Sequence, residues 1–205
     1  MLPKKTIERL SLYRRVLLTS SENGNDYIFS HELASLLHLT SVQVRRDIML
    51  IGYTGTQRKG YKISELIKKI NSILNEKEKT NVVIVGMGHL GKAITNYFNS
   101  NNSNIQIVAA FDIDPSKTDK IIAGIKSYHI NELEKVLKQS NASIAIMALS
   151  SKGAQSVADK LVHSGIKGIL NFTSVPINVS DDVYIENYDM ITSLEKVAYF
   201  VKEKK

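Results

Sequence analysis

Residues 81–112 read NVVIVGMGHLGKAITNYFNSNNSNIQIVAAFD, and this stretch decides the fold. It opens with an apolar run over residues 81–85, passes through a glycine-rich turn, and closes with a second apolar run that ends at Asp112. A strand, a tight turn, a helix and a second strand in this order are typical of a parallel sheet with helices on its faces. We therefore predict an α/β fold built on a Rossmann-like, doubly wound parallel sheet.

The turn after the first apolar run has the spacing GxGxxG. In that motif the first glycine permits the tight turn, the second lets the backbone approach a pyrophosphate, and the third lets the helix pack close to the strand. The phosphates would lie at the positive dipole end of a helix that we expect to begin near Gly91. We predict that the turn binds a dinucleotide, the alternative being a nucleotide-fold domain with an empty or altered pocket. The expected contacts are Gly86, Met87, Gly88, His89, Leu90 and Gly91.

An acidic residue follows the turn at the spacing expected of a dinucleotide-binding motif. Asp112 lies 21 positions after Gly91, at the end of the second apolar run. An acid at this place can accept hydrogen bonds from a ribose 2′-hydroxyl, whereas the 2′-phosphate of NADP(H) would meet a like charge. Asp112 therefore predicts NAD(H) as the ligand.

The alternation of strand and helix continues beyond the second apolar run. Residues 144–149, 166–172 and 183–186 are expected strands, and residues 154–162 are expected to be helical. This alternation indicates a parallel, doubly wound sheet.

Ligands bind such sheets at the carboxyl ends of the strands. Ser150 and Ser151, together with residues 171–174, should therefore line the same cleft as the glycine turn. The hydroxyls of Ser150 and Thr173 are candidates for ligand contacts, and helix capping is an equally good interpretation of them.

The first third of the chain is expected to be helical. The spacing of apolar residues predicts an amphipathic helix over residues 6–20, and a helix capped by Ser30 follows after a loop. Thr40 and Gln43 have capping-box spacing, which fixes the start of a third helix, and Ser64 is expected to cap a fourth. The tight connection before Thr40 predicts a helix-turn-helix, although a helical dimerisation or docking domain is the alternative. The residues expected to be buried in the first three helices are Ile7, Leu10, Tyr13, Leu17, Leu33, Leu36, Leu37, Val44, Ile48 and Ile51.

Polar and basic residues mark the expected outward side of the third helix. Glutamine can pair bidentately with adenine, and arginine can pair with guanine or hold a phosphate. The segment over residues 52–61 is punctuated by glycine and basic near its tip, which is typical of a wing. The predicted DNA contacts are Ser41, Gln43, Arg45 and Arg46 in the helix and Arg58 and Lys59 in the wing.

The composition supports this division of the chain. Its 205 residues carry a net charge of +7, and residues 1–76 contain 12 Lys and Arg against 7 Asp and Glu, compared with 15 against 13 in residues 77–205. A basic segment beside a nearly neutral one suggests a polyanionic partner such as double-stranded DNA, while a solvated lysine-rich surface is the alternative. The chain contains no cysteine, which excludes disulfides and direct thiol redox sensing.

No targeting signal is recognisable. The N-terminus lacks the apolar stretch of a signal peptide, and no window is apolar and long enough to span a bilayer. We therefore expect a cytoplasmic protein without a membrane partner.

We expect no catalytic residue and no metal site. The roughly 90 residues after Asp112 are needed to complete the sheet, whereas a hydride-transfer enzyme normally adds a substrate domain. The five histidines are scattered without metal-ligand spacing. Two other hypotheses remain: a small NAD-dependent oxidoreductase with a basic docking domain, and a DNA-binding regulator that responds to another nucleotide ligand such as coenzyme A.

The end of the chain predicts one further helix, over residues 191–201. One side of it is so apolar that it must either fold back on its own sheet or pack against a second subunit.

Taken together, these motifs resemble the Rex family of redox-sensing transcriptional repressors over nearly the full length. The stretches that carry the resemblance are Arg9-Leu10 with Tyr13, residues 43–47 (QVRRD), Gly60-Tyr61, residues 86–91, residues 109–115 (AAFDIDP), residues 165–172 (GIKGILNF) and residues 186–189 (ENYD).

The resemblance implies a homodimer that exchanges its C-terminal helices, and that represses genes of fermentation or anaerobic respiration. It implies release from operator DNA when NADH binds, with NAD+ competing. By position, Arg15, Tyr97 and Asp189 match residues that couple the ligand state to the domain interface, and Tyr97 and Asp189 would pair across the dimer in the DNA-binding arrangement.

The sequence departs from the family pattern at a few positions. The basic pair of the wing is shifted two places, to Arg58 and Lys59, and Ser150 replaces a usual proline. Thr173-Ser174 stands where Ala-Pro is usual, and Met190 replaces a larger aromatic or apolar residue. The expected organisation is a winged-helix DNA-binding domain at 1–76, a linker at 77–80, an NAD(H)-binding Rossmann domain at 81–190, and a C-terminal helix at 191–205 that is exchanged in a dimer.

Overall fold

The computed structural model describes residues 2–56, 58–74, 79–100 and 104–203. The chain divides into two compact units, Met1–Glu78 and Lys79–Lys205. Half of the expected linker, residues 77 and 78, lies outside the described residues, and Thr80 already belongs to the first strand of the second unit. Each unit has its own hydrophobic core.

The N-terminal unit is a small winged helix-turn-helix. A two-stranded antiparallel sheet pairs Tyr27 with Lys62 and Ile28 with Tyr61, and joins the loop after the first helix to the end of the wing. In chain order the elements are α1 (Lys4–Glu22), β1 (Tyr27–Ile28), α2 (Ser30–Leu36), α3 (Ser41–Leu50), β2 (Tyr61–Lys62) and α4 (Ile63–Ile73).

Two of the residues expected in the core of this unit are exposed, and a third, Leu37, is only partly buried. Ile7 is 36% exposed, because the buried side of α1 begins at Thr6, one residue earlier and about 100° around the helix. Leu36 is 61% exposed, and Ala34 is buried beside Leu33 in its place. The other expected core residues of α1 and α3 are buried: Leu10, Tyr13, Leu17, Val44, Ile48 and Ile51.

Two helices also begin before the predicted positions, α2 by one residue and α4 by two. Ser30 is the first residue of α2 rather than its cap. Phe29 is the N-cap instead, and its amide donates a hydrogen bond to the Glu32 carboxylate at 2.6 Å. The helix α4 begins at Ile63 rather than after Ser64, because the buried Ile63 donates its amide to the carbonyl of Asp26 at 2.9 Å. In contrast, α3 begins where the capping pattern predicted, since the Thr40 hydroxyl accepts the amide of Gln43 at 3.2 Å.

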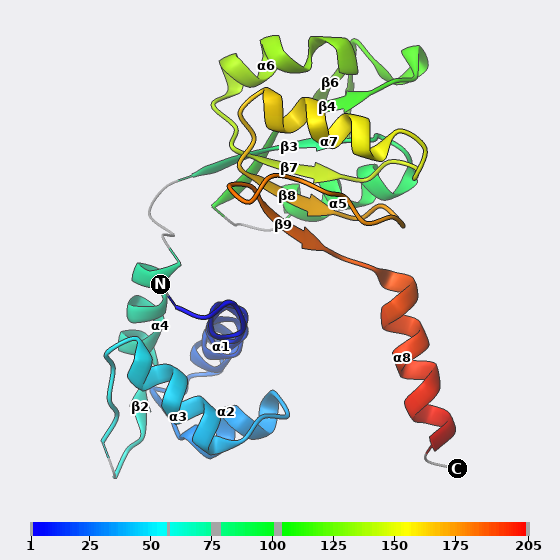
Figure 1. Cartoon of the computed structure of the whole chain (residues 1–205). Helices are drawn as coiled ribbons and strands as arrows, with labels where there is room; N and C mark the ends of the chain where they lie inside the picture. Colours follow the sequence, from blue (N-terminus) through cyan, green and yellow to red (C-terminus); the bar gives the residue numbers. More distant parts are fainter. Residues whose placement is uncertain (1, 57, 75–78, 101–103, 204–205) are drawn as a thin grey trace. The chain divides into compact units, whose positions relative to one another are not determined.

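The C-terminal unit is a seven-stranded sheet with helices on both faces (Figure 1). Its strand order is β5-β6-β4-β3-β7-β8-β9, and the neighbouring strands are parallel except for β5 and β6. The elements are β3 (Thr80–Val85), α5 (His89–Ser100), β4 (Ile105–Asp112), η1 (Pro115–Lys117), β5 (Lys120–Ile122), β6 (Ile125–His129), η2 (Ile130–Glu132), α6 (Leu133–Ser140), β7 (Ile144–Met147), α7 (Ala154–His163), β8 (Gly168–Asn171), β9 (Tyr184–Asn187) and α8 (Met190–Glu203).

The central strand β3 is buried on both faces. Val83 and Val85 contribute to the core that holds residues of α6 and α7, whereas Val82 and Ile84 contribute to the core on the face of α5. This alternation follows from the two-residue period of a strand. Because β3 is followed in sequence by β4 on one side and flanked by β7 on the other, the strand order reverses at β3, which is where ligands bind in such sheets.

The predicted parallel, doubly wound sheet is confirmed, with one antiparallel strand added at an edge. The strand β5 runs antiparallel to β6, and the turn between them is Ala123-Gly124 with φ of 51° and 79°. Two successive residues with positive φ are the requirement of a tight type I′ hairpin, in which alanine is an unusual first residue. The sequence therefore gave little sign of this hairpin.

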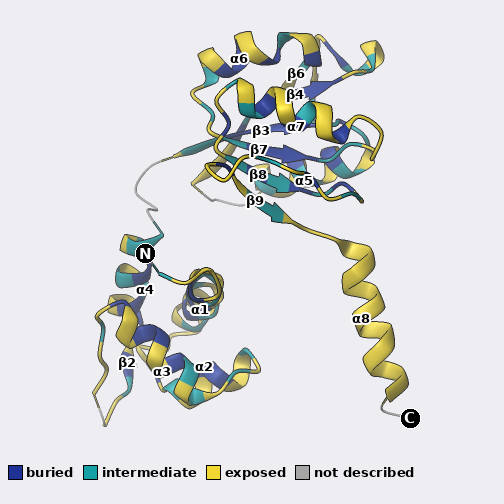
Figure 2. Cartoon of the chain, in the orientation of Figure 1, coloured by how far each residue is buried: buried dark blue, intermediate teal, exposed yellow. Residues whose placement is uncertain are grey.

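The last helix, α8, does not fold back on its own sheet. All of its described residues are exposed, including Leu194, Val197 and Phe200 (Figure 2). Its start is fixed by Asp189, whose carboxylate accepts the amides of Ile191 at 2.9 Å and Thr192 at 3.1 Å. Of the two alternatives predicted for this helix, packing on its own sheet is thus excluded in this structure.

Candidate dinucleotide cleft and DNA-binding face

The glycine turn between β3 and α5 has three glycines in three different environments. Gly86 has φ of +99°, and a Cβ there would lie 2.5 Å from the carbonyl oxygen of Ala148. A Cβ on Gly91 would collide with the carbonyl oxygen of Gly86, so α5 can approach the turn only because this residue has no side chain. A Cβ on Gly88 would have no described atom within 4 Å.

These environments match the requirements of a phosphate-binding turn. Gly86 and Gly91 are needed for the fold, whereas Gly88 leaves space beside the first turn of α5, which begins at His89 rather than near Gly91. The amino end of that helix carries unpaired amide groups and a partial positive charge, which suits a phosphate. The turn therefore fits a dinucleotide.

Asp112 has a structural role that the sequence did not reveal. Its side chain is only 7% exposed, because one carboxylate oxygen accepts the amide of Met87 at 2.7 Å and the other accepts the amide of Asp114 at 2.9 Å. The ammonium group of Lys117 lies 3.8 Å from the first oxygen. The carboxylate thus holds the glycine turn in place, and each oxygen keeps a second lone pair for another donor.

A hollow of about 240 Å³ lies at the carboxyl ends of β3, β4 and β7. Gly86, Asp112 and Ser150 line it together, as the strand order predicted. Lys152 and Lys160, which were not among the predicted site residues, line it as well and add positive charge. Both belong to the segment around α7, and only the fold brings them to the end of β3.

Thr173 lies away from this hollow. It is buried, and its hydroxyl lies 2.7 Å from the side-chain oxygen of Asn171 and 3.1 Å from the carbonyl of Val175. Its amide also donates to Asn171 at 3.0 Å. In this structure the hydroxyl therefore organises the turn after β8, and no described helix begins there for it to cap.

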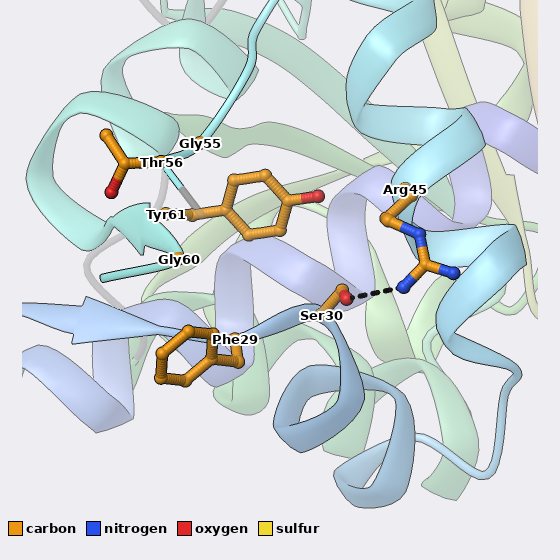
Figure 3. Close-up of a pocket in the computed structure, with 7 residues that line it drawn as sticks. All are labelled: Phe29, Ser30, Arg45, Gly55, Thr56, Gly60 and Tyr61. Atoms are coloured by element: carbon orange, nitrogen blue, oxygen red, sulfur yellow. Dashed lines mark hydrogen bonds between the residues drawn. The ribbon is translucent and has the colours of Figure 1, made fainter. Parts of the chain in front are cut away.

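The outward side of α3 carries the residues predicted to contact DNA. Arg45 and Arg46 are exposed, and Ser41 and Gln43 are half-buried. A guanidinium nitrogen of Arg45 donates to the Ser30 hydroxyl at 3.1 Å, which ties α3 to the start of α2. Figure 3 shows this bond at the edge of a hollow of about 320 Å³, with the ring of Tyr61 facing the same space.

The wing is closed by its own backbone. Thr56 and Gly60 exchange two hydrogen bonds, of 2.8 Å and 2.9 Å, and Gly60 has φ of +73° with no room for a Cβ beside the carbonyl of Ile28. Arg58 and Lys59 are exposed at its tip. The ammonium group of Lys59 lies 5.3 Å from the centre of the Tyr27 ring, so a cation–π contact directs it.

A buried carboxylate links α1 to α3. Asp47 is fully buried and accepts hydrogen bonds from Arg9 at 2.6 Å and 2.9 Å and from Tyr13 at 2.7 Å. Gln43 donates to the same carboxylate at 3.0 Å. Burial acts to raise the pKa of Asp47, but the hydrogen bonds from Arg9 and Tyr13 outweigh it and hold that pKa below its usual value.

Asp47 is not among the residues that sequence reasoning predicted to be functional. An acidic residue on the inner side of an amphipathic helix was the available signal, since such a residue is buried only with partners. Its partners on α1 lie 34 and 38 residues away, which helical spacing does not reveal.

The three residues implied in switching lie on three elements. Arg15 is exposed on α1, Tyr97 is 62% exposed on α5, and Asp189 caps α8. The Tyr97 ring packs edge-on against Phe98 at 5.7 Å. Hydrogen bonds from Thr192 hold the pKa of Asp189 below its usual value.

Metal chemistry and membrane insertion find no support in the described part of the chain. Among these residues there is no cluster of His, Cys, Asp or Glu that could hold a metal ion. Nor does any described helix combine the length and apolar character needed to cross a bilayer.

A winged helix-turn-helix and a glycine-turn Rossmann unit in one chain define the class of DNA-binding regulators that respond to a nucleotide. Known proteins place the chain within this class. It is 37% identical over 204 residues to the redox-sensing transcriptional repressor Rex of Lactobacillus acidophilus, covering 100% of this chain and 97% of that protein. It is 38% identical over 201 residues to the Rex of an Exiguobacterium species, covering 98% and 92%. The chain belongs to the Rex family of redox-sensing transcriptional repressors.

Solved structures and family models agree with this assignment. The structure of the Rex-family repressor RSP in complex with β-NAD+ and operator DNA matches with a TM-score of 0.91 at 32% identity, covering 100% of this chain and 94% of that one. RSP in complex with β-NADH matches with a TM-score of 0.89 at 31% identity, covering 100% and 96%. The family model of a putative DNA-binding protein N-terminus matches residues 1–48, and that of a CoA binding domain matches residues 77–175. The curated relatives are named as regulators rather than as enzymes.

Proposed function

We propose that this chain binds operator DNA as a homodimer, represses transcription there, and leaves the operator when it binds NADH. It would thus read the ratio of NADH to NAD+. The observation that carries this proposal is the pairing of an outward basic helix and wing with a glycine turn in which Gly88 leaves open space beside the amino end of α5. The full-length likeness to RSP, solved with β-NAD+ and operator DNA and also with β-NADH, supports it.

For the DNA contacts, we assign α3 to the major groove and the wing to the backbone or minor groove. The exposed charges on both elements suit phosphate contacts, which supply most of the affinity and make it depend on salt. The assigned residues are Ser41, Gln43, Arg45, Arg46, Arg58 and Lys59.

For the ligand, we assign the pyrophosphate to the turn over residues 86–91 and to the amino end of α5. Asp112 keeps lone pairs that can accept a ribose hydroxyl while it holds the turn. Ser150 and Lys152 would complete the cleft at the ends of the strands. The ligand serves here as a signal, and we assign no catalytic residue.

For the assembly, the uncovered apolar side of α8 supports a homodimer in which this helix packs against a second subunit. We propose that Arg15, Tyr97 and Asp189 couple the ligand state to the domain interface. In the DNA-binding arrangement, Asp189 would accept a hydrogen bond from Tyr97 across the dimer. Because the target is operator DNA, this work would take place in the cytoplasm.

A second ligand deserves a direct comparison, because the family model that matches residues 77–175 is a CoA binding domain. Asp112 favours NAD(H), since an acid beside the ribose suits a free hydroxyl rather than a phosphate. Calorimetry with NADH, NAD+, NADPH and coenzyme A separates these ligands. We expect NADH to bind most tightly of the four. If coenzyme A binds more tightly than NADH, coenzyme A is the signal instead.

The proposed function is tested by the anisotropy of a labelled palindromic operator, titrated with the protein with and without NADH. A nearly complete switch requires a difference in affinity of about 10⁴-fold, or about 5.5 kcal/mol, between the two arrangements of the dimer. Unchanged operator affinity at saturating NADH would overturn the proposal. Turnover of NADH with a substrate would favour the oxidoreductase hypothesis instead.

A further inference from the structure

In α3, the helix that carries the predicted DNA contacts, the side-chain amide of Gln43 is oriented by a buried residue of the same helix. Gln43 and Asp47 lie one turn apart on α3, and the amide nitrogen of Gln43 donates to Oδ1 of Asp47 at 3.0 Å. Gln43 is half-buried, whereas Asp47 is fully buried. An ionised carboxylate only accepts hydrogen bonds, so the nitrogen of this amide, and not its oxygen, must face Asp47.

Asp47 is itself held from α1. Its Oδ2 accepts from Nε of Arg9 at 2.6 Å and from the hydroxyl of Tyr13 at 2.7 Å, and its Oδ1 accepts from Nη2 of Arg9 at 2.9 Å. The Thr6 hydroxyl adds a longer contact to Oδ1, at 3.4 Å. With these donors in place the carboxylate cannot turn away from Gln43 without breaking charge-assisted bonds, which are about twice as strong as neutral ones.

The orientation of the amide decides what Gln43 offers to a base. One amide hydrogen is used by Asp47, which leaves the carbonyl oxygen and the second amide hydrogen for a ligand. That pair is complementary to N6 and N7 of adenine in the major groove. Guanine presents two acceptors there and would oppose the carbonyl oxygen.

We propose that Asp47 is a positioning residue for sequence recognition, which fixes the amide of Gln43 in the orientation that selects adenine. The inference rests on the proposed function, since it takes α3 as the helix that enters the major groove. Without the carboxylate, the amide can rotate by 180° and present its nitrogen and oxygen in exchanged positions. The preference for adenine at the base pair read by Gln43 would then be lost while DNA binding through phosphate contacts remains.

The test measures base preference rather than affinity alone. Wild-type protein and the variants Gln43→Ala, Asp47→Asn and Tyr13→Phe are each bound to duplexes in which every position of the operator is changed in turn. We expect Gln43→Ala and Asp47→Asn to lower the preference for adenine at the same base pair by about tenfold. Tyr13→Phe is the matched control, because it removes a buried donor from Oδ2 and leaves the bond of Gln43 to Oδ1, so its preference should remain within about twofold of wild type.

Two results would overturn the inference. One is an Asp47→Asn protein that folds and keeps the wild-type preference, and the other is a Tyr13→Phe protein that loses as much preference as Asp47→Asn. If wild type selects an operator but Gln43→Ala changes no position, this inference fails and the proposed function stands. If wild type selects no duplex sequence, both fail.

A measurement on the wild-type protein covers the case in which Asp47→Asn does not fold. In nuclear magnetic resonance spectra of the side-chain amides, we expect one hydrogen of Gln43 to exchange with water more slowly than the other, because only one is bonded to Asp47. Equally fast exchange of both hydrogens would contradict the proposed orientation. The variant Gln43→Glu adds a third check, since it cannot donate to Asp47 and should lose the preference for adenine.

Discussion

Gly88 differs from the other glycines of its turn because a side chain there would meet none of the described atoms. Gly86 and Gly91 are required by close backbone contacts, so a change at either position acts on folding. Gly88 is free of that requirement and lies beside the amino end of α5, where a phosphate would gain from the helix dipole. Gly86 and Gly91 are thus needed for the conformation of the turn, whereas Gly88 leaves open space for a ligand.

The first prediction uses this difference. In Gly88→Asp the new carboxylate occupies the place assigned to a phosphate, so NADH affinity should fall at least tenfold while the melting temperature stays within about 2 °C of wild type. Gly91→Ala is the contrasting variant, because its methyl group collides with the Gly86 carbonyl and should cost about 1–3 kcal/mol of unfolding free energy. Calorimetry and thermal unfolding measure the two effects. Unaltered NADH binding by Gly88→Asp would place the ligand elsewhere.

The second prediction concerns the buried carboxylate between α1 and α3. Because the pKa of Asp47 is lowered in the folded protein, its stabilising contribution is present at neutral pH and is lost as the pH falls below about 4 toward the folded-state pKa. Wild type should therefore lose unfolding free energy between pH 5 and pH 3, as followed by denaturant titration. Asp47→Asn should be less stable at pH 7 and should lose less over the same range. Parallel curves for the two proteins would show that Asp47 does not titrate as described.

At the scale of single residues, the sequence predicted where the site residues lie better than it predicted their hydrogen-bond partners. The glycine spacing and Asp112 identified the cleft, because both follow from the local order of strand, turn and helix. The hydrogen bond from Met87 to Asp112 and the contacts of Asp47 with α1 were not predictable, since they join residues 25 to 41 positions apart. Lys152 was missed for the same reason.

Elements that depend on local pattern were predicted well, and those that depend on their neighbours were not. The start of α3 followed from Thr40 and Gln43, and β3 and β4 followed from their apolar runs. The hairpin of β5 and β6 has only short strands at the edge of the sheet, and α6 is a helix of eight residues. Short elements carry too few periodic positions to be distinguished from loops.

The wing supports a prediction about charge. Arg58 and Lys59 are exposed at its tip, so replacing either with alanine should weaken DNA binding similarly across sequences and reduce the salt dependence of log K by about 1. Lys138→Ala is a suitable control, because this exposed lysine pairs with Glu134 on α6 of the other unit. Operator affinity measured at several salt concentrations gives the slopes. An unchanged slope for both wing variants would remove the wing from the DNA interface.

The last helix supports a prediction about assembly. Leu194 and Val197 are 70% and 58% exposed on the apolar side of α8, so the double variant Leu194→Glu with Val197→Glu should be monomeric if this side is the dimer contact. Lys196→Gln changes the same helix off that side and should leave the dimer intact. Sedimentation velocity distinguishes the two species. A dimeric double variant would assign the subunit interface to another surface.

At the scale of the whole molecule, the chain joins a DNA-binding unit to a nucleotide-binding unit. Membership of the Rex family is the reason to expect that the ligand bound by one unit controls the other. The uneven charge and the change of pattern near residue 80 already indicated two units. What α8 packs against could not be read from the sequence, because an apolar helix side fits its own sheet and a second subunit equally well. The structure excludes the first of these.

The central claim is that the two units are coupled through the ligand. Coupling between binding sites is reciprocal, so if NADH lowers the affinity for operator DNA, operator DNA must lower the affinity for NADH by the same factor. Calorimetric titration of NADH into the free protein and into the saturated operator complex measures that factor directly. We predict clearly weaker binding of NADH to the operator complex, by the factor that the operator titration gives, and equal affinity in the two titrations would contradict the account.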